Sequence, residues 1–419
     1  MNHVLHLRSL ISGRTFRTDE IDYVDPEFGP DGIVDVVYDY DLIKRHISRE
    51  SLRDNRDYSM WRYKPLLPIE PDAAVPPLQI GWTPIYDTPR LAADLGLRRL
   101  WVKDDGRNPT ASFKDRASAI AVIKAQERGA EIITTASTGN AAAALSGICA
   151  SVGQANVIFV PEKAPQAKVA QLLAYGAMVM LVKGNYDDAF ELCLRATDTY
   201  GWYNRNTGFN PYMSEGKKTA TLEICEQLSW QAPDRIFVSV GDGCIIGGLH
   251  KGLKDLLALG WIDHMPKMMG VQAEGSNYLA EAWENGEDVL TKAPIDAQTV
   301  ADSISAGLPR DRMKAMAAVK ETGGAYITLT DEEILAAIPA LARGSGVFAE
   351  PAGAAAYAGL VKAVQQGLVS ADERIVVLNT GSGLKDVAGV MKGVELSGTK
   401  AYHVAPNLED LRRVIAELG

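Results

Sequence analysis

Short apolar runs alternate with helical patterns along most of this 419-residue chain. The runs are continuous in hydrophobicity, which is typical of parallel strands that are buried on both faces of a sheet. Helical patterns such as residues 188–200 and 217–228 lie between them. The alternation predicts an α/β fold with parallel-rich sheets covered by helices. The strand-like runs are residues 100–102, 132–135, 157–160, 178–182, 236–240, 269–272, 325–329 and 374–378.

The length exceeds what one ordinary core needs and predicts two or three packed units. Residues 1–80 are rich in Asp, Tyr and Arg and end in a proline-dense stretch, which predicts an N-terminal arm. We expect a small α/β domain over residues 118–205. The large α/β domain is expected to combine residues 81–117 and 206–419, and to end in an amphipathic helix over residues 407–418.

Composition excludes several kinds of partner. A net charge of −10 and a pI near 5.2 argue against a nucleic-acid surface. The sequence has no signal-peptide pattern and no run of ~18 apolar residues, so we expect a cytoplasmic protein without a membrane partner. No C-x-x-C pair occurs, so no metal site or disulfide framework is expected. The cysteines are Cys149, Cys193, Cys225 and Cys244.

Four unusual segments follow predicted strands, where open α/β sheets bind their ligands. The first is Ser-Phe-Lys-Asp-Arg, residues 112–116, ahead of a predicted helix over residues 117–127. A helix start disfavours a cation, but it suits an amine that must be neutral to attack a carbonyl. Taken alone, the segment favours an ordinary solvated Lys114.

The second segment is Ser-Thr-Gly-Asn, in which Ser137 and Thr138 form either a carboxylate-binding nest or a plain helix cap. The third is the glycine-rich stretch 240–248, whose amides are suited to wrapping a phosphate ahead of a predicted helix over residues 249–259. It looks superficially like a dinucleotide fingerprint but lacks the acidic residue about 20 positions on. The fourth places hydroxyls of Thr380 and Ser382 after the last strand.

Together the four segments resemble the fold-type II pyridoxal-phosphate enzymes, such as the β subunit of tryptophan synthase, and most closely the threonine synthases. The order and spacing of Ser-Phe-Lys-Asp, Ser-Thr-Gly-Asn and the glycine-rich stretch match that family. The resemblance covers roughly residues 80 to 390. Further matching segments are residues 210–212, 215–219, 350–355 and 380–386.

The resemblance implies pyridoxal 5'-phosphate as cofactor and a role for each matching residue. Lys114 holds the cofactor as a Schiff base and shuttles protons, Asn140 bonds the ring hydroxyl oxygen, and Thr380 faces the ring nitrogen. Ser137 and Thr138 seat the substrate carboxylate. The cofactor phosphate is held by the glycine-rich loop, namely Gly241, Asp242, Gly243, Cys244 and Ile245. The resemblance also implies a homodimer.

The sequence departs from the family where the substrate phosphate is expected. Threonine synthases read Asn-Ser-x-Asn-Pro-x-Arg, whereas this chain reads Thr-Gly-Phe-Asn-Pro-Tyr-Met over residues 207–213, with Thr207 at the first asparagine and Met213 at the arginine. Residues 141 and 142 are alanines where the family has Thr-Ser. Loss of a planar guanidinium weakens a phosphate clamp, and a lysine supplies only a point charge. The cations that could compensate are Arg205, Lys217 and Lys218. The cysteine ribbon found near the N-terminus of some relatives is absent, and any zinc role with it.

The sequence leaves four hypotheses about the protein's function open. The first is a threonine synthase that converts O-phosphohomoserine and water to threonine and phosphate. The second is a threonine-synthase-like lyase that carries out β-elimination or β-replacement, as a dehydratase or deaminase does, on another amino acid. The apolar surroundings of Phe209 and Met213 favour the second. A non-catalytic paralogue is opposed by the intact Lys114, and a nicotinamide-dependent dehydrogenase by the missing acidic residue. In the two lyase hypotheses, the binding partner is a small-molecule amino-acid substrate.

Overall fold

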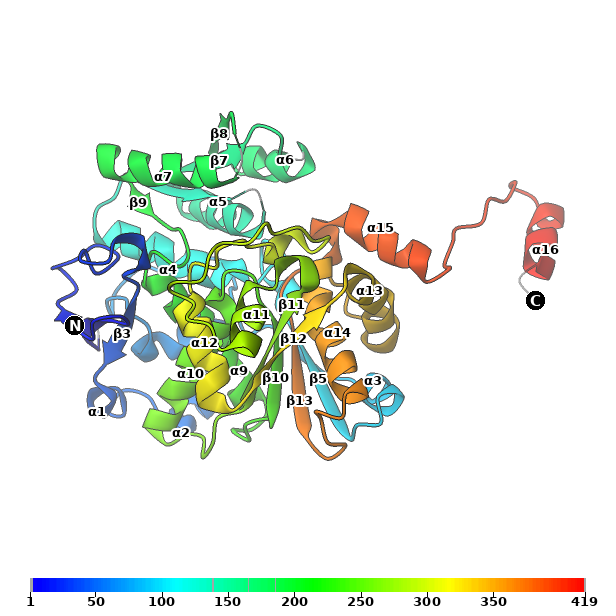
Figure 1. Cartoon of the computed structure of the whole chain (residues 1–419), viewed down its shortest axis with the longest axis horizontal. Coiled ribbons are helices and arrows are strands. Elements are labelled where there is room, and N and C mark those ends of the chain that lie inside the picture. The colour runs from blue at the N-terminus through cyan, green and yellow to red at the C-terminus, as the bar shows by residue number, and fades with distance from the viewer. Residues whose placement is uncertain (1–2, 138, 165, 185, 418–419) are drawn as a thin grey trace.

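The computed structural model of the protein describes residues 3–137, 139–164, 166–184 and 186–417. These residues form three separate sheets of three, six and four strands. Figure 1 shows the four-stranded sheet and its helices above the six-stranded sheet, with the N-terminal strands to one side. Over the described residues, no helix combines the length and the apolar character needed to cross a membrane.

The six-stranded sheet is parallel except at one edge. Its spatial order is β12-β11-β10-β13-β5-β4, and only β4 runs antiparallel to its neighbour. Five predicted apolar runs fall on these strands, with Val240 one residue beyond the end of β10. The strands are β4 (Ile85–Asp87), β5 (Arg99–Asp104), β10 (Arg235–Ser239), β11 (Lys267–Ala273), β12 (Ala325–Leu329) and β13 (Arg374–Asn379).

Continuous apolar strands arise here because both faces of the sheet are covered. In β10, Ile236 and Val238 join one hydrophobic cluster while Phe237 joins the other. Figure 1 shows α9, α10 and α12 on one side of the sheet and α13 and α14 on the other. The helices of this part are α3 (Pro89–Asp94), α4 (Lys114–Glu127), α8 (Tyr212–Lys217), α9 (Thr219–Gln227), α10 (Cys244–Leu259), α11 (Tyr278–Asn285), α12 (Arg312–Thr322), α13 (Asp331–Ser345), α14 (Pro351–Gln365) and α15 (Val387–Leu396).

The four-stranded sheet is wholly parallel, with the order β8-β7-β6-β9. Its strands are β6 (Ile132–Ala136), β7 (Ala155–Pro161), β8 (Met178–Val182) and β9 (Tyr203–Asn204), and its helices are α5 (Asn140–Val152), α6 (Gln166–Ala174) and α7 (Tyr186–Tyr200). The interpretation that every apolar run is buried on both faces is wrong for β8. As an edge strand it leaves Met178, Met180 and Leu181 exposed.

The N-terminal residues contain an antiparallel sheet that sequence reasoning did not predict. The strands β1 (Val4–Ser9), β2 (Thr15–Phe16) and β3 (Val34–Tyr38) pair in the order β2-β1-β3. They are followed by α1 (Tyr40–Ile43) and α2 (Arg49–Asp54). The Tyr38 hydroxyl donates to Glu215 on α8 at 2.6 Å, and the Tyr40 hydroxyl donates to Asp255 on α10 at 2.6 Å. This unit therefore braces the helices that flank the site.

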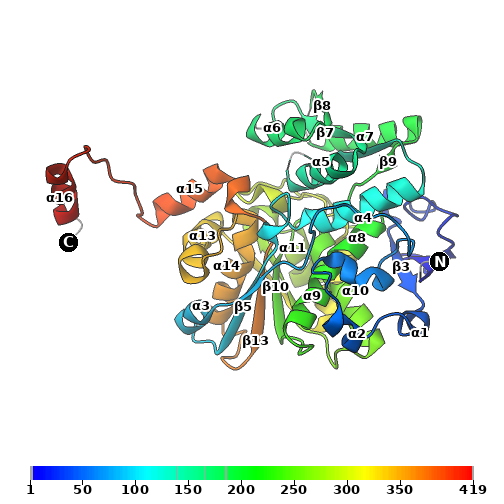
Figure 2. The same ribbon diagram turned by 180° about the vertical axis from the view of Figure 1, so that it is seen from behind.

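The last helix, α16 (Leu408–Glu417), lies within the predicted range, and residue 418 falls outside the described part of the chain. Asn407 caps it by accepting a hydrogen bond from the Asp410 amide at 2.8 Å. Figures 1 and 2 both show α16 well away from the body of the molecule, at the end of an extended connection.

Candidate active site

Lys114 lies where the two parallel sheets meet. It is the first residue of α4, so this helix begins three residues earlier than the sequence predicts. The amide of Phe113 donates to the carbonyl of Thr380 at 2.9 Å, and Ser112 forms an isolated bridge with Gly381. These contacts tie the start of α4 to the loop after β13. The structure thus brings together Lys114 and Thr380, two of the predicted site residues.

The surroundings of Lys114 favour the neutral form of its side-chain amine over the charged ammonium. Burial is the largest influence and lowers the pKa of Lys114, and the nearby Arg205 acts in the same direction. Cys244, Glu350 and Asp242 oppose this change without cancelling it. A depressed ammonium pKa increases the fraction of nucleophilic amine near neutral pH. Lys114 is therefore chemically suited to attack a carbonyl and to exchange protons.

Asn140, the first residue of α5, contacts a carboxylate that the sequence analysis did not assign to the site. Its Nδ2 donates to Oε1 of Glu350 at 2.7 Å, and less closely to Oγ of Ser303 at 3.4 Å. Burial raises the pKa of Glu350 to about 7, although Lys114 and the Asn140 bond act in the opposite direction. The sequence feature that could have pointed to Glu350 is the Glu-Pro pair directly ahead of an alanine-rich helix. Glu350 immediately precedes α14, where it bonds Asn140 and its charge interacts with that of Lys114.

The glycine-rich loop after β10 is shorter and tighter than the sequence suggests. A Cβ on Gly241 would come within 2.8 Å of the Ile304 Cα, and Gly243 has a left-handed φ of +85° that glycine tolerates. The Asp242 carbonyl accepts a hydrogen bond from the Asp311 amide at 2.9 Å, which fixes the turn. Burial raises the pKa of the Asp242 carboxyl. The loop is held close to the start of α10.

The predicted helix start at residue 249 is wrong, because α10 begins at Cys244. Gly247 and Gly248 are therefore helical, and they serve packing. A Cβ on Gly247 would lie 2.7 Å from the Lys314 Cβ, and one on Gly248 would lie 2.6 Å from the Lys217 Cβ. Because α10 starts early, the amides of Cys244 and Ile245 belong to its first turn, whose N–H groups have no partner within the helix. A helix start of this kind favours a phosphate.

The predicted substrate residues fall into different environments. The Ser137 hydroxyl accepts from the Gly139 amide at 3.2 Å, a local turn contact, and Thr138 lies outside the described residues. The Thr207 hydroxyl accepts from Arg205 Nη1 at 3.0 Å. Met213 is fully buried within the hydrophobic core. Methionine there is a packing residue of the core.

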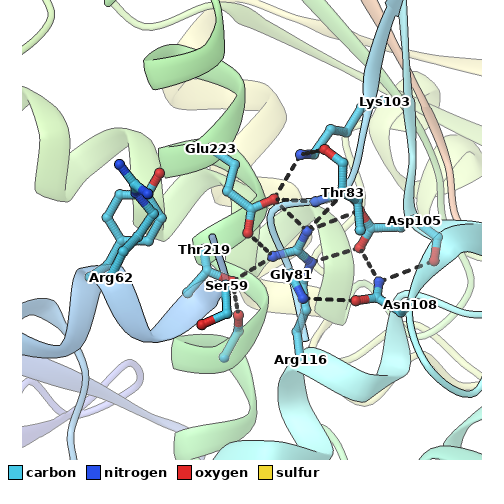
Figure 3. Close-up of polar contacts among 12 residues, drawn as sticks. Ser59, Arg62, Gly81, Thr83, Lys103, Asp105, Asn108, Arg116, Thr219 and Glu223 are labelled. Carbon is cyan, nitrogen blue, oxygen red and sulfur yellow. Dashed lines mark hydrogen bonds and ion pairs between the residues drawn. The ribbon is translucent and has the colours of Figure 1, made fainter. Parts of the chain in front are cut away.

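A buried network of charges fixes α4 behind Lys114. The Arg116 guanidinium bonds Asp105 through Nε at 2.6 Å and also pairs with Glu223 of α9, while Lys103 donates to the same Glu223 at 2.7 Å. All four side chains are fully buried. Figure 3 shows Arg116 between the two carboxylates, with Thr83 beside them. Two cations and two anions balance, so the helix start is anchored without a net buried charge.

A cavity of about 110 Å³ opens between the two parallel-sheet units. Asn140, Lys168 and Gln171 line it from the smaller unit, and Glu350 and Lys385 line it from the larger one. Lys168 pairs with Asp302, and Lys385 donates to Gln171 at 2.6 Å, so polar contacts cross between the units at its rim. Glu350 lines this cavity, and its charge also acts on Lys114.

The residues present fit pyridoxal phosphate. A partly neutral lysine, a glycine loop that a Cβ would obstruct and the start of a sixteen-residue helix supply the amine and the anion site. Two buried hydroxyls nearby, Oγ of Ser112 and Oγ of Ser239, have no hydrogen-bond partner among the described residues. Within the same residues, no cluster of His, Cys, Asp and Glu is suited to hold a metal ion.

Comparison with known proteins places the chain in a family. Residues 77–381 match the family described as pyridoxal-phosphate dependent enzyme. A threonine synthase of Methanocaldococcus jannaschii is 39% identical over 98% of this chain and 99% of its own length. One from Methanosarcina acetivorans is 41% identical over 98% of each chain. The chain therefore belongs to the threonine synthases, within the pyridoxal-phosphate-dependent enzymes.

Solved structures agree on the fold. The processed form of threonine deaminase isoform 2 from Solanum lycopersicum superposes with a TM-score of 0.66 at 21% identity, covering 86% of this chain and 89% of that one. Diaminopropionate ammonia lyase from Escherichia coli gives 0.63 at 18% identity, covering 75% and 86%. These likenesses confirm the predicted fold-type II architecture. The family confirms the cofactor, pyridoxal 5'-phosphate, and the class, a lyase.

Proposed function

We propose that this chain converts O-phosphohomoserine and water to threonine and inorganic phosphate. The observation that carries the proposal is the similarity to two threonine synthases along 98% of the chain. The surroundings of Lys114 support it, because its amine has a lowered pKa and lies where the two parallel sheets meet. The reaction needs an amine of this kind at the reacting carbon.

Lys114 is the residue to which we assign proton transfer. Pyridoxal phosphate, when bound, withdraws electrons from the substrate and makes its Cα proton acidic. The free amine of Lys114 then takes the proton from Cα, and further transfers at Cβ allow the γ-phosphate to leave before water adds at Cβ. General acid–base steps of this kind contribute about 10²–10⁴-fold each. The fixed start of α4 keeps this amine in one position.

We assign the remaining predicted residues to binding. Asn140 would hold the ring hydroxyl of the cofactor, and its bond to Glu350 would fix the orientation of its amide. Thr380 would offer a neutral hydroxyl to the ring nitrogen, which does not enforce ring protonation as a carboxylate would. Ser137 and Thr138 would seat the substrate carboxylate. The amides of residues 241–245 would hold the cofactor phosphate.

The predicted domain boundaries remain part of this proposal. We assign residues 118–205 to the small domain, residues 81–117 and 206–419 to the large domain, and residues 1–80 to the N-terminal extension. All four strands of the smaller parallel sheet lie between Ile132 and Asn204, which supports the first assignment. The cavity beside Glu350 would then be the cleft between the two domains.

We further propose that the protein acts as a homodimer in the cytoplasm. The exposed apolar side chains of α16, among them Leu408 and Ile415, support dimerisation, since this helix lies away from its own body. Exposed Val387 and Met391 of α15 offer a second apolar surface on the same C-terminal segment. All four cysteines are buried free thiols, as suits a reducing compartment. Sedimentation of the protein with and without residues 398–419 tests the dimer.

The activity is tested by incubating the holoenzyme with O-phosphohomoserine and measuring phosphate and threonine together. Serine and threonine deamination are assayed beside it, because buried Met213 favours the alternative of β-elimination or β-replacement on an uncharged amino acid. Stoichiometric release of phosphate and threonine is the expected result. Deamination without phosphate release at millimolar substrate would overturn the proposal and establish the alternative.

A further inference from the structure

Lys217 differs from the other lysines that are completely buried. Lys103 and Lys218 are equally inaccessible, and each forms ion pairs with carboxylates: Lys103 with Glu223, and Lys218 with Asp255 at 2.6 Å. The Nζ of Lys217 has no hydrogen-bond partner among the described residues. A buried ammonium without a counter-ion is costly, so proteins pair such groups or use them to bind an anion.

The ammonium of Lys217 lies in the same cluster of charges as the candidate catalytic lysine. Burial lowers the pKa of Lys217 to about 8, and the positive charges of Arg205 and Lys114 contribute to that change. Cys244 and Asp311 act in the opposite direction. Lys217 and Arg205 therefore form a cluster of two buried cations, and the Lys217 side chain packs against Gly248 of α10. Such a cluster is suited to an anion with more than one negative charge.

Arg205 completes this cluster from the other parallel-sheet unit. It follows β9 and is almost fully buried. Its Nε donates to Ser118 at 3.1 Å and its Nη1 to Thr207 at 3.0 Å, and both acceptors are neutral hydroxyls. These bonds orient the guanidinium. A planar guanidinium held in this way is pre-organised to bind phosphate.

Lys217 also stands one helical turn from the position where the family pattern breaks. Met213 and Lys217 are four residues apart on α8 and share one face of that helix. The arginine that the family places at position 213 is therefore missing next to an unpaired cation. Lys218, the other candidate on this helix, is excluded because Asp255 and Glu215 already neutralise it.

We propose that Lys217 and Arg205 bind the phosphate group of the substrate and so replace the missing arginine. This inference rests on the proposed function. The cofactor phosphate is the second possible source of such an anion, but the loop 241–245 and the first turn of α10 already form a site for it. Lys217 reaches the cluster from the side of Met213 and α8, where the family pattern places the substrate phosphate.

The test uses two ligands that differ only in the anionic group. The phosphonate analogue 2-amino-5-phosphonopentanoate and norvaline share the same carbon chain, so their affinity ratio isolates the contribution of the phosphonate. We expect calorimetry on the holoenzyme to show that Lys217→Met lowers this ratio roughly 10- to 100-fold, as loss of a hydrogen bond to a charged group does. Lys217→Arg should largely preserve the ratio, and Lys392→Met, on the exposed face of α15, should leave it unchanged.

The possible outcomes distinguish a failure of this inference from a failure of the proposed function. An unchanged ratio in Lys217→Met and in Arg205→Met, with phosphate release still observed in the unaltered protein, would overturn this inference alone. A lower affinity for pyridoxal phosphate with an unchanged ratio would also overturn it, by assigning Lys217 to the cofactor. Absence of phosphate release from O-phosphohomoserine in the unaltered protein would overturn the proposed function. Melting temperatures of all variants establish that each is folded.

Discussion

Nδ2 of Asn140 donates to Oε1 of Glu350 across 2.7 Å, joining the first residue of α5 to the residue that precedes α14. The two helices belong to different parallel-sheet units, so the bond joins these units beside the cavity that both residues line. Glu350 is buried, and burial raises its pKa to about 7. A carboxyl group with such a pKa changes its charge within the range in which enzymes are assayed.

This relationship predicts a pH-dependent stability. Because the folded pKa of Glu350 is raised, the folded state binds its proton more tightly than the unfolded state does. The stabilising effect is complete below the unfolded pKa of about 4.3 and is lost as the pH rises through about 7. Glu350→Gln keeps an oxygen for Asn140 and removes the titration. We expect urea unfolding of the cofactor-free variant to exceed wild-type stability by up to ~3 kcal/mol at pH 8 and by little at pH 4.5. A difference independent of pH would contradict this.

Lys114→Ala should abolish turnover without unfolding the protein. The side chain takes no part in the buried network of Arg116, Asp105 and Glu223 that anchors α4, so its removal leaves the helix start in place. We expect loss of the visible absorbance that the bound cofactor owes to this lysine, with an unchanged circular dichroism spectrum. A cofactor that borohydride still attaches covalently to the variant would show that another amine carries it.

Thr380→Ala should slow the removal of the Cα proton while cofactor binding is largely retained. The carbonyl of Thr380 already accepts from the Phe113 amide, and this backbone bond survives the substitution. Only the hydroxyl assigned to the ring nitrogen is lost, which costs ~1–3 kcal/mol, or roughly 5- to 150-fold in rate. Stopped-flow measurement of Cα deprotonation checks this. An unchanged rate and an unchanged cofactor spectrum would show that the hydroxyl does not face the ring.

The fold was predictable where strand and helix patterns are local. Runs such as residues 325–329 became strands because both faces of the larger sheet are covered, and β8 departs from this because it lies at an edge. The start of α10 was misplaced because Gly247 and Gly248 look like a loop in sequence. In the structure, both glycines are helical, and because they have no side chain, Lys314 can pack against Gly247 and Lys217 against Gly248.

Short motifs in the sequence indicate part of the candidate site, namely Lys114, Asn140 and the loop after β10, and their functional roles remain predictions. Glu350 was not assigned, and Lys217 was named only as one of three cations that could compensate for the missing arginine, since the significance of both depends on burial and on partners distant in sequence. No local pattern distinguishes Lys217 from Lys218. Only the packing of α8 shows that Lys218 pairs with Asp255, whereas the Nζ of Lys217 has no hydrogen-bond partner among the described residues.

The buried network in Figure 3 predicts a strong dependence of stability on Glu223. This carboxylate accepts from Lys103 at 2.7 Å and from Arg116, and all three side chains are fully buried. Removing the charge leaves two buried cations with only Asp105 to balance them. Breaking a buried pair in this way costs about 3–5 kcal/mol. We expect Glu223→Gln to lower the free energy of unfolding by that amount, measured in urea.

The matched control for this substitution is Glu417→Gln. Glu417 pairs with Arg413 on α16 at 3.1 Å, but both side chains are more than half exposed. An exposed pair at this spacing contributes about 0.3–0.5 kcal/mol, so the control should change the unfolding free energy by less than 1 kcal/mol. Equal effects of the two substitutions would show that the Glu223 network does not anchor α4. Because Arg116 lies on the same helical turn as Lys114, Glu223→Gln should also lower kcat more than it raises KM.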